Sequence, residues 1–411
     1  MRKSSLLIVT IAVSGALTLS ACGSRGGKSD SGSDSAKGDT KVVIGVDAPL
    51  TGKLSALGQG IKNSVDLAVN KANKDKVVPG VTFAIEALDD QANPTSGQQN
   101  ATKLVGEKDV AGVVGPLNSS VSLTMQKVFN DAHLAQISPA NTNPQLSLGP
   151  DWGSGKFARP YASFFRTATT DVVQGKFAAQ YLFNDAKKTK VYVIDDKKTY
   201  GAGLAAIFQE EFKKLGGTVV GTDHVNPDDK DFSAVATKVA AAGADSVYYG
   251  GEYPEAGPLS DQIKKAGAAV PLFGGDGIYD DEYIKLSNGN SNGDLATSVG
   301  APVEELDSAK TFINDYKAAN YKDAYAAYGG YSYDAAWSLV EAVKAVVAAN
   351  GGKVPSDLRQ KVIDALGKVS FDGVTGKVSF DEYGDTTNKQ LTVYTVKDGK
   401  WTAVKSGTYN G

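Results

Sequence analysis

Two short segments place hydroxyl side chains where a helix is expected to begin, which is the chemistry needed to hold a small anion. Ser119 and Ser120 follow the predicted strand 110–114, and Thr142 follows the predicted strand 135–138. Serine is a good helix N-cap, and the unpaired backbone N–H groups of a first helical turn attract anions. The two segments therefore predict a carboxylate site. A role limited to capping their own helices would use the same residues, so both interpretations stay open.

Catalytic and metal chemistry have little support in this chain. Its only histidines are His133 and His224, and its only cysteine is Cys22, which excludes an internal disulfide and a cysteine-based zinc site. A serine nucleophile needs a nearby base, but His133 lies roughly 20 Å along the predicted helix from Ser120. The glycines of 201–206 imitate a dinucleotide motif without the tight strand-to-glycine turn. We expect no catalysis, no metal and no cofactor.

Length and composition indicate a globular protein of more than one domain. The 411 residues predict two or three domains, since a domain takes about 150 residues. Hydrophobic residues make up 41% of the chain and charged residues 22%, and the formal net charge is −3. The chain lacks the basic excess that DNA or RNA attracts, so we expect no nucleic-acid partner.

The beginning of the chain is typical of a targeting segment. Arg2 and Lys3 precede the apolar run 6–19, which is too short to cross a bilayer comfortably. The sequence Leu19-Ser20-Ala21-Cys22 that follows resembles a bacterial lipobox. We expect residues 1–21 to be a signal peptide, Cys22 to carry a lipid that anchors the protein to the outer face of the cell membrane, and residues 22–40 to be a flexible linker. An ordinary secretory signal is the alternative.

Apolar periodicity from residue 41 onward predicts an alternation of strands and helices. The first series has strands 42–46, 81–88, 110–114 and 135–138 and helices 58–73, 95–106 and 120–132. After an irregular stretch at 147–161, the second series has strands 191–194, 218–220, 246–249 and 271–274 and helices 203–215, 232–242 and 259–266. Three helices (308–320, 332–350, 356–366) and two strands (377–380, 391–396) close the chain. This pattern predicts an α/β fold of two doubly wound parallel-sheet lobes, with ligands bound beyond the carboxyl ends of the strands.

An ordered series of motifs resembles the branched-chain amino-acid-binding proteins of bacterial ABC transporters. In the first half these are VDAPLTG at 46–52, GPLNSS at 115–120 and SPANTNP at 138–144, and in the second half DKKTYGAG at 196–203, YYGGEYPE at 248–255 and GGDG at 274–277. The resemblance extends from residue 41 to about residue 385. It implies a type 1 periplasmic binding protein, with lobe 1 formed by 41–168 plus 300–382, lobe 2 by 169–299 plus 383–411, and a hinge of three crossings between them.

The resemblance also implies which residues meet the ligand. Ser119, Ala140 and Thr142 are similar to the residues that hold the α-carboxylate and α-ammonium groups of an amino acid from lobe 1. Tyr200 is similar to the residue that closes over the ligand from lobe 2, and Asp276 to the acidic residue that pairs with its ammonium group. Charge-assisted hydrogen bonds of this kind suit micromolar binding of a small zwitterion.

Two positions of the predicted site depart from the family pattern. Leu57 stands where relatives carry an aromatic residue, which reshapes that end of the pocket, and Glu252 stands where a tyrosine is common. A second carboxylate near Asp276 would suit a ligand with an additional amine or guanidinium group, or it would point to solvent. Tyr328, in an aromatic series that we expect to pack against the core, could also reach the cleft.

The expected function is therefore that of an extracytoplasmic solute-binding lipoprotein of an ABC transporter. The branched-chain amino acids are the cargo that the resemblance implies, the permease subunits are the expected partners, and we expect a monomer. Another small solute (an amide, urea, a basic amino acid or an aromatic acid) is an alternative ligand. A receptor module that reports the ligand to a signalling partner is an alternative function.

Overall fold

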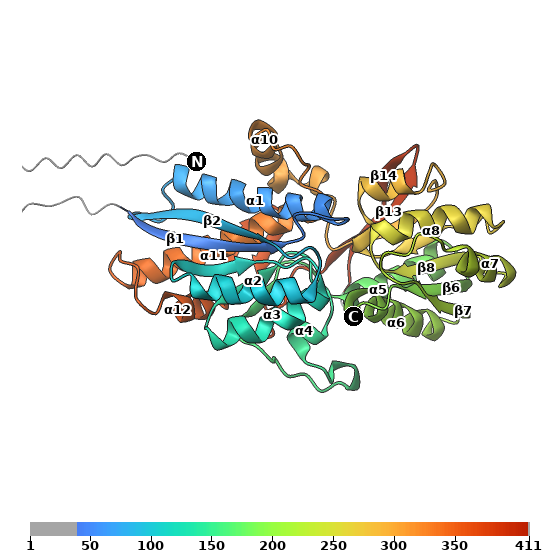
Figure 1. Ribbon diagram of the computed structural model, residues 1–411, viewed down its shortest axis with the longest axis horizontal. Helices are drawn as coiled ribbons and strands as arrows, with labels where there is room; N and C mark the ends of the chain where they lie inside the picture. The colour runs from blue at the N-terminus through green and yellow to red at the C-terminus, as the bar shows by residue number, and fades with distance from the viewer. Residues whose placement is uncertain (1–38, 410–411) are drawn as a thin grey trace, which may run out of the picture. The chain divides into compact units, whose positions relative to one another are not determined.

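Two separate sheets organise residues 39–409, which are the residues that the computed structural model describes (Figure 1). Residues 39–411 form one unit of the chain. The predicted signal peptide 1–21, the predicted lipidation site Cys22 and nearly all of the predicted linker 22–40 lie outside the described residues. No helix within 39–409 is both long enough and apolar enough to cross a membrane.

The first sheet has five parallel strands in the order β2-β1-β3-β4-β5. These are β1 (Thr40–Ala48), β2 (Val81–Asp89), β3 (Val110–Val114), β4 (Ala135–Ser138) and β5 (Phe164–Arg166). All five residues of β3 are buried. A continuous apolar run is what a parallel strand needs when helices cover both faces of its sheet.

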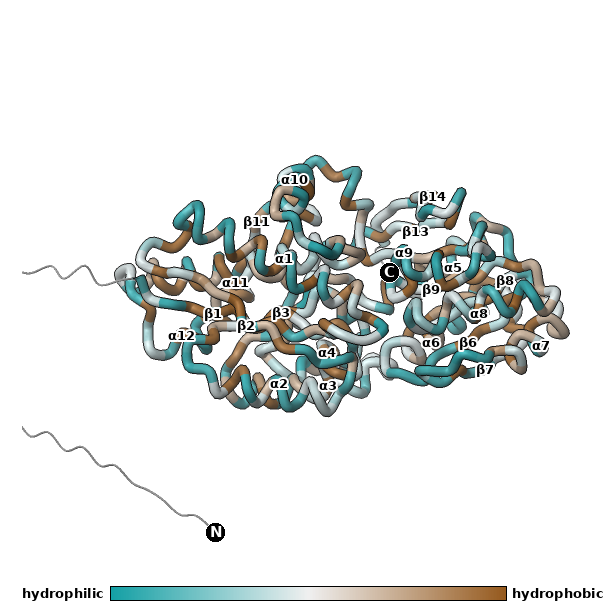
Figure 2. The backbone as a smooth tube through the Cα atoms, turned by 45° about the horizontal axis from the view of Figure 1, so that its top comes forward, coloured by the Kyte–Doolittle hydropathy of each residue, from teal (hydrophilic) through white to brown (hydrophobic). Residues whose placement is uncertain are grey.

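Five helices cover this first sheet. These are α1 (Ser55–Lys74), α2 (Pro94–Gly106), α3 (Ser119–Asp131), α11 (Gly329–Ala349) and α12 (Leu358–Leu366). On one face, Ile44 packs in a cluster with Ile61 of α1 and with α11, whereas on the other face Val43 packs with α2 and α3. Figure 2 shows hydrophobic segments along α11 and the neighbouring strands. The alternation of Val43 and Ile44 follows from the twofold side-chain period of a strand.

The second sheet has seven strands in the order β14-β13-β10-β9-β8-β6-β7. Five are parallel to one another: β6 (Lys190–Asp195), β7 (Thr218–His224), β8 (Ser246–Gly250), β9 (Leu272–Gly274) and β10 (Leu295–Ser298). The other two, β13 (Gln390–Lys397) and β14 (Lys400–Thr408), form an antiparallel edge. The associated helices are α5 (Asp171–Gln180), α6 (Thr199–Lys214), α7 (Ser233–Ala241), α8 (Tyr253–Lys265) and α9 (Asp281–Leu286).

Shorter elements complete the described chain. These are α4 (Gln145–Leu148), α10 (Lys310–Ala318), the hairpin of β11 (Ser370–Gly373) and β12 (Gly376–Ser379), the single turns Trp152–Ser154, Asp276–Ile278, Val303–Glu305 and Asp307–Ala309, and a π-helical turn at Tyr181–Asp185. The prediction that the last strand is 391–396 is wrong, because β14 follows it. β14 escaped prediction because its sequence contains no continuous apolar run.

The predicted fold class, two parallel-sheet lobes with flanking helices, is confirmed. The chain passes between the sheets after β5, after β10 and after β12, since β1–β5, α11 and α12 belong to the first sheet and β6–β10 and β13 to the second. We use lobe 1 for the elements on the first sheet and lobe 2 for those on the second. The boundary residues that we predicted for the lobes (168, 299 and 382) stay predictions.

Candidate functional site

A small cavity lies where residues of the two lobes meet at the carboxyl ends of their parallel strands. Its volume is about 20 Å³, close to the space that one water molecule needs. It is lined by Leu57, Leu117, Asn118, Ser119, Ala140, Tyr200, Glu252, Asp276, Gly277 and Tyr328. Six of the seven residues predicted for the ligand site are therefore together, and the seventh, Thr142, is not in the lining.

A larger cavity of about 570 Å³ lies elsewhere, between α11 and α12. It does not adjoin the carboxyl ends of the strands, and it contains none of the predicted site residues. Ligands of doubly wound sheets bind at those strand ends. The smaller cavity is therefore the candidate site.

The lobe 1 side of the cavity consists of two tied loops. Ser138, at the end of β4, donates its hydroxyl to the carbonyl of Pro116 at 2.8 Å and accepts the backbone N–H of Asn141 at 2.9 Å. Asn141 in turn donates its side-chain amide to the carbonyl of Leu117 at 2.8 Å. These bonds fix the loop before α3 against the loop after β4, so the start of α3 faces the cavity from a fixed position.

Ser119 is the first residue of α3 and is almost fully buried. The first N–H groups of a helix have no partner within the helix and carry a positive partial charge. The preceding residue, Asn118, makes no side-chain capping bond to α3. The Asn118 side chain therefore leaves the first N–H groups of α3 uncapped.

Thr142 does not line the cavity. Its side chain is buried, and the hydroxyl oxygen has no hydrogen-bond partner among the described residues. The carbonyl of Thr142 accepts the backbone N–H of Asp171 at 2.8 Å, next to a crossing between the lobes. Burial, and then the charge of Asp276, raise the pKa of Asp171 to about 8.

The lobe 2 side is dominated by Asp276, which follows β9. Its Oδ1 accepts the hydroxyl of Tyr200 at 2.7 Å and the side-chain amide of Gln174 at 2.9 Å. Its Oδ2 accepts the hydroxyl of Tyr328 at 2.8 Å. Burial raises the pKa of Asp276, although the three donated hydrogen bonds act in the opposite direction. Asp276 is therefore a buried carboxylate held rigidly, with no cation beside it in the described residues.

Glu252 is the residue before α8 and is only 5% exposed, so the expectation that it could point to solvent is wrong. Its Oε2 accepts the ammonium group of Lys198 at 2.6 Å, and its Oε1 accepts the side-chain amide of Asn118. The carboxylate of Asp196 lies 3.9 Å from the Lys198 ammonium. Burial and the charge of Glu252 raise the pKa of Asp196 to about 7.

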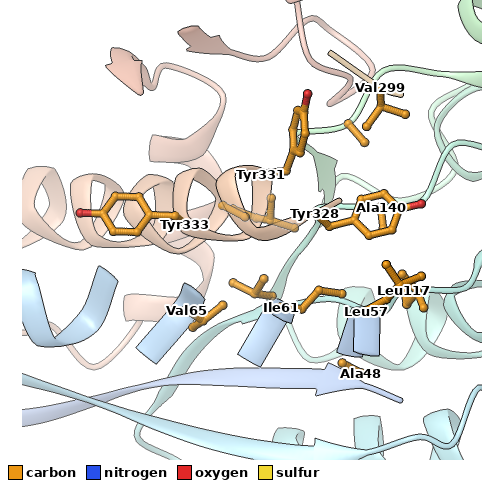
Figure 3. Packing of buried hydrophobic residues seen from close by; sticks show 14 of the residues in the cluster. Ala48, Leu57, Ile61, Val65, Leu117, Ala140, Val299, Tyr328, Tyr331 and Tyr333 are labelled. Atoms are coloured by element: carbon orange, nitrogen blue, oxygen red, sulfur yellow. The ribbon is translucent and has the colours of Figure 1, made fainter. Parts of the chain in front are cut away.

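The remaining wall is apolar. Figure 3 shows Leu57, Leu117, Ala140 and Tyr328 gathered at one end of the buried cluster that α1 and α11 form. Tyr328 reaches the cavity as the sequence suggested. Leu117, Asn118 and Gly277 were missed as site residues, although their places beside Ser119 and Asp276 could have indicated them.

Contacts between the lobes continue outside the cavity. The ammonium group of Lys53 in lobe 1 lies 2.7 Å from the carboxylate of Asp228 and 3.4 Å from that of Glu255, both in lobe 2. The side chain of Asn143 donates to the carbonyl of Thr199 at 2.8 Å. The two lobes therefore also touch outside the cavity.

The cavity combines a helix N-terminus and a serine from lobe 1 with a buried carboxylate from lobe 2. The lining holds neither histidine nor cysteine, and residues 39–409 contain no group of side chains arranged to hold a metal ion. Two lobes that enclose polar groups of opposite character define the class of two-lobed solute-binding proteins.

The chain belongs to the periplasmic binding protein family, whose profile matches residues 41–400. It is 32% identical over 364 residues to the Leu/Ile/Val-binding protein homolog 3 of Brucella melitensis, covering 87% of this chain and 92% of that protein. It is 31% identical over 366 residues to the Leu/Ile/Val-binding protein BraC3 of Rhizobium johnstonii, covering 89% and 94%. Members of this family are substrate-binding proteins of transporters and act outside the cytoplasm.

Solved structures agree with this assignment. The branched-chain amino acid transporter substrate-binding protein LivJ of Streptococcus pneumoniae, in complex with isoleucine, has a TM-score of 0.78 at 26% identity and covers 90% of this chain and all of its own. The leucine-binding protein LivK of Thermotoga maritima has a TM-score of 0.77 at 25% identity, covering 89% and 98%. A solute-binding protein of R. palustris in complex with benzoate shares the fold with a TM-score of 0.77 at 19% identity, covering 90% and 97%.

Proposed function

We propose that this chain captures an α-amino acid between its two lobes and delivers it to the permease of an ABC transporter. The observation that carries the proposal is the pairing, in one cavity, of the Ser119 helix end with the Asp276 carboxylate. A zwitterion offers one group of matching charge to each. The relatives that are named as Leu/Ile/Val-binding proteins support the same class of ligand.

The α-carboxylate group is assigned to lobe 1. Ser119 supplies its hydroxyl, and the first N–H groups of α3 supply donors with a favourable dipole. The backbone of Ala140, in the facing loop, lies in the same lining. Charge-assisted hydrogen bonds contribute roughly 1.5–3 kcal/mol each. A few of them give micromolar affinity, about 8 kcal/mol, after the cost of ordering is subtracted.

The α-ammonium group is assigned to Asp276. The carboxylate receives hydrogen bonds from Gln174 and Tyr200 of its own lobe, so its orientation is fixed before the ligand arrives. A carboxylate whose pKa is raised by burial gains most from a cation brought beside it. Thr142, which the resemblance also assigns to the ligand, does not line the cavity, and its role stays a prediction.

Binding and closure are coupled in this proposal. A cavity of about 20 Å³ cannot admit an amino acid while the lobes touch, so the lobes must separate to load the ligand. Closure then brings Tyr200 and Asp276 of lobe 2 against a ligand held by lobe 1. A ligand shifts such an equilibrium only through contacts that the open form does not make. The permease then recognises the closed form.

The expectations about mode of action, oligomeric state, membrane anchoring and cargo are also part of this proposal. The protein acts as a binding protein rather than an enzyme, works as a monomer, and is held at the outer face of the cell membrane by a lipid on Cys22. Branched-chain side chains are the cargo that the relatives' names suggest. Which ligand side chain the cavity accepts depends on the lining residues that do not bind the ligand's α-carboxylate and α-ammonium groups.

A thermal-shift panel tests the proposal. The purified chain is heated with each of the common L-amino acids and with analogues that lack either the α-amino or the α-carboxyl group. At a hundredfold excess over Kd, a true ligand adds about 2.7 kcal/mol of stability. We expect stabilisation by at least one L-amino acid and by neither of its analogues. If no amino acid stabilises the chain against heat, the proposal is contradicted.

A double variant checks the lobe 1 part of the site. Replacing Ser119 and Thr142 together by alanine removes the two hydroxyls assigned to the ligand. We expect the stabilising amino acid to lose its effect while the unliganded melting temperature changes little. An unchanged ligand response in the double variant would show that lobe 1 holds the ligand elsewhere.

A further inference from the structure

Apart from the tyrosines bonded to Asp276, the cavity lining contains two polar side chains that the α-carboxylate and α-ammonium groups do not use. These are Asn118 of lobe 1 and Glu252 of lobe 2. They are joined by a hydrogen bond from the Asn118 side-chain amide to Oε1 of Glu252. We call these two residues the polar pair. Because the polar pair spans both lobes, it contacts whatever part of the ligand lies between them.

Asn118 has spare hydrogen-bonding capacity in a buried place. Its residue is 5% exposed, and its side-chain oxygen Oδ1 is buried with no partner among the described residues. The side chain does not cap α3, so helix stability does not explain its presence. Buried polar atoms are nearly always hydrogen-bonded. An unpaired acceptor in a ligand cavity indicates a donor on the ligand.

Glu252 adds a second acceptor, and it shares the ammonium group of Lys198 with the carboxylate of Asp196. Lys198 lies 2.6 Å from Oε2 of Glu252 and 3.9 Å from Oδ2 of Asp196. Burial lowers the pKa of Lys198, but the charges of Glu252 and Asp196 raise it by more, so the ammonium group stays protonated. A cationic ligand side chain would approach this fixed positive charge. The donor that fits is therefore a neutral one.

We infer that the ligand's side chain ends in a neutral hydrogen-bond donor, and that a carboxamide, whose NH₂ group offers two N–H donors to the polar pair, is the best match. This inference rests on the proposed capture of an α-amino acid and specifies its side chain. Leu57 and Leu117 contact the methylene part of that side chain, and the polar pair accepts its terminal N–H groups. The sequence-based alternative of a basic amino acid is disfavoured by Lys198.

An aliphatic side chain of the same shape is the main competitor that the cavity must reject. Its methyl groups would cover the Asn118 oxygen and the Glu252 carboxylate without offering a donor. Sites built to hydrogen-bond a substrate group discriminate strongly against an analogue that lacks it, because buried polar atoms are then left unpaired. The polar pair thus separates polar from aliphatic amino acids of equal size.

Calorimetric titration of the full chain with isosteric pairs of L-amino acids tests the inference. Asparagine and leucine have side chains of similar shape, as do threonine and valine, and lysine and arginine are the cationic probes. We expect asparagine or glutamine to bind at least about tenfold more tightly than leucine, threonine to bind more tightly than valine, and the cationic pair to bind weakly. Tightest binding of leucine, isoleucine, valine, lysine or arginine would overturn the inference and leave the proposed function standing. If no α-amino acid binds, the proposed function fails, and the inference fails with it.

Substitutions test whether the polar pair causes the preference for asparagine over leucine. Asn118→Leu removes the unpaired acceptor at nearly constant volume, and we expect the asparagine-to-leucine affinity ratio to fall at least about tenfold. Asn70→Leu, an exposed change on α1, is the matched control and should leave that ratio unchanged. An unchanged ratio in Asn118→Leu, or an equal fall in the control, would contradict the assignment.

Discussion

The hydroxyl of Tyr328 donates to Oδ2 of Asp276 at 2.8 Å, and the two residues belong to different lobes. Tyr328 immediately precedes α11 on the first sheet, whereas Asp276 follows β9 of the second sheet. The bond can therefore form only when the lobes touch. It joins lobe closure directly to the carboxylate that we assign to the ligand's ammonium group.

Tyr328→Phe removes this bond and keeps the aromatic ring. We expect ligand affinity to fall about tenfold, because a hydrogen bond to a charged group that exists only in the closed form is lost. Isothermal titration calorimetry measures the change. Tyr316→Phe is the control, since its hydroxyl bonds to the carbonyl of Asp323 within lobe 1. Wild-type affinity in Tyr328→Phe, or an equal loss in the control, would show that this bond does not couple closure to binding.

The buried ion pair of Arg166 and Asp385 should matter for stability rather than for ligand selectivity. Nε of Arg166 lies 2.6 Å from Oδ1 of Asp385, and the guanidinium also donates to the carbonyls of Asn141 and Asn143 at 3.1 and 2.9 Å. We expect Arg166→Met to lower the free energy of unfolding by about 3–5 kcal/mol, because it leaves a buried carboxylate unpaired. Urea denaturation measures the change.

Two further variants separate the ion pair from ordinary packing. Adding Asp385→Leu to Arg166→Met should recover part of the lost stability, because the unpaired buried carboxylate of Asp385 is then removed. Arg359→Met, which also breaks hydrogen bonds to backbone carbonyls but leaves no buried carboxylate behind, should cost less. If the double variant is no more stable than Arg166→Met alone, the unpaired charge is not the cause.

Asp171 should make stability depend on pH. Its pKa is raised to about 8 in the folded protein, first by burial and then by the charge of Asp276, against about 3.9 in an unfolded chain. The folded state therefore binds more protons between these values. The contribution of Asp171 to stability is fully present below about pH 4 and is lost as the pH rises towards 8, by an amount on the order of a few kcal/mol.

Urea denaturation of wild type and Asp171→Asn at pH 5 and pH 8 measures this contribution. We expect the variant to gain stability relative to wild type on going from pH 5 to pH 8, because asparagine does not ionise. Asp151→Asn, an exposed change, should show the same pH dependence as wild type. Parallel pH profiles for wild type and Asp171→Asn would mean that Asp171 is ionised throughout this range.

The sequence was sufficient to predict the parallel sheets because their strands are continuous apolar runs, as in 110–114. It was insufficient for β5, a strand of three residues, and for the full length of α8, where Pro254 and Pro258 obscured the helical pattern. Proline at the start of a helix costs little, which explains why α8 begins at Tyr253, ahead of the predicted residue 259.

The residues of the site were likewise predicted only in part. Ser119, Tyr200 and Asp276 were predicted from ordered motifs, and all three line the cavity. Lys198 was not assigned a role, because its pairing with Glu252 joins residues 54 positions apart in the chain. That pairing depends on β6 and β8 lying side by side although β7 separates them in sequence. Long-range pairings of this kind cannot be predicted from local patterns.

The central claim is that Asp276 recognises the α-ammonium group of the ligand. Calorimetric titration of wild type and Asp276→Asn with the tightest-binding amino acid, and with the same molecule lacking its α-amino group, tests this claim most directly. We predict that wild type prefers the amino acid by at least about a hundredfold and that the preference falls to less than about tenfold in Asp276→Asn. An undiminished preference in Asp276→Asn would contradict the claim, because another group would then hold the ammonium.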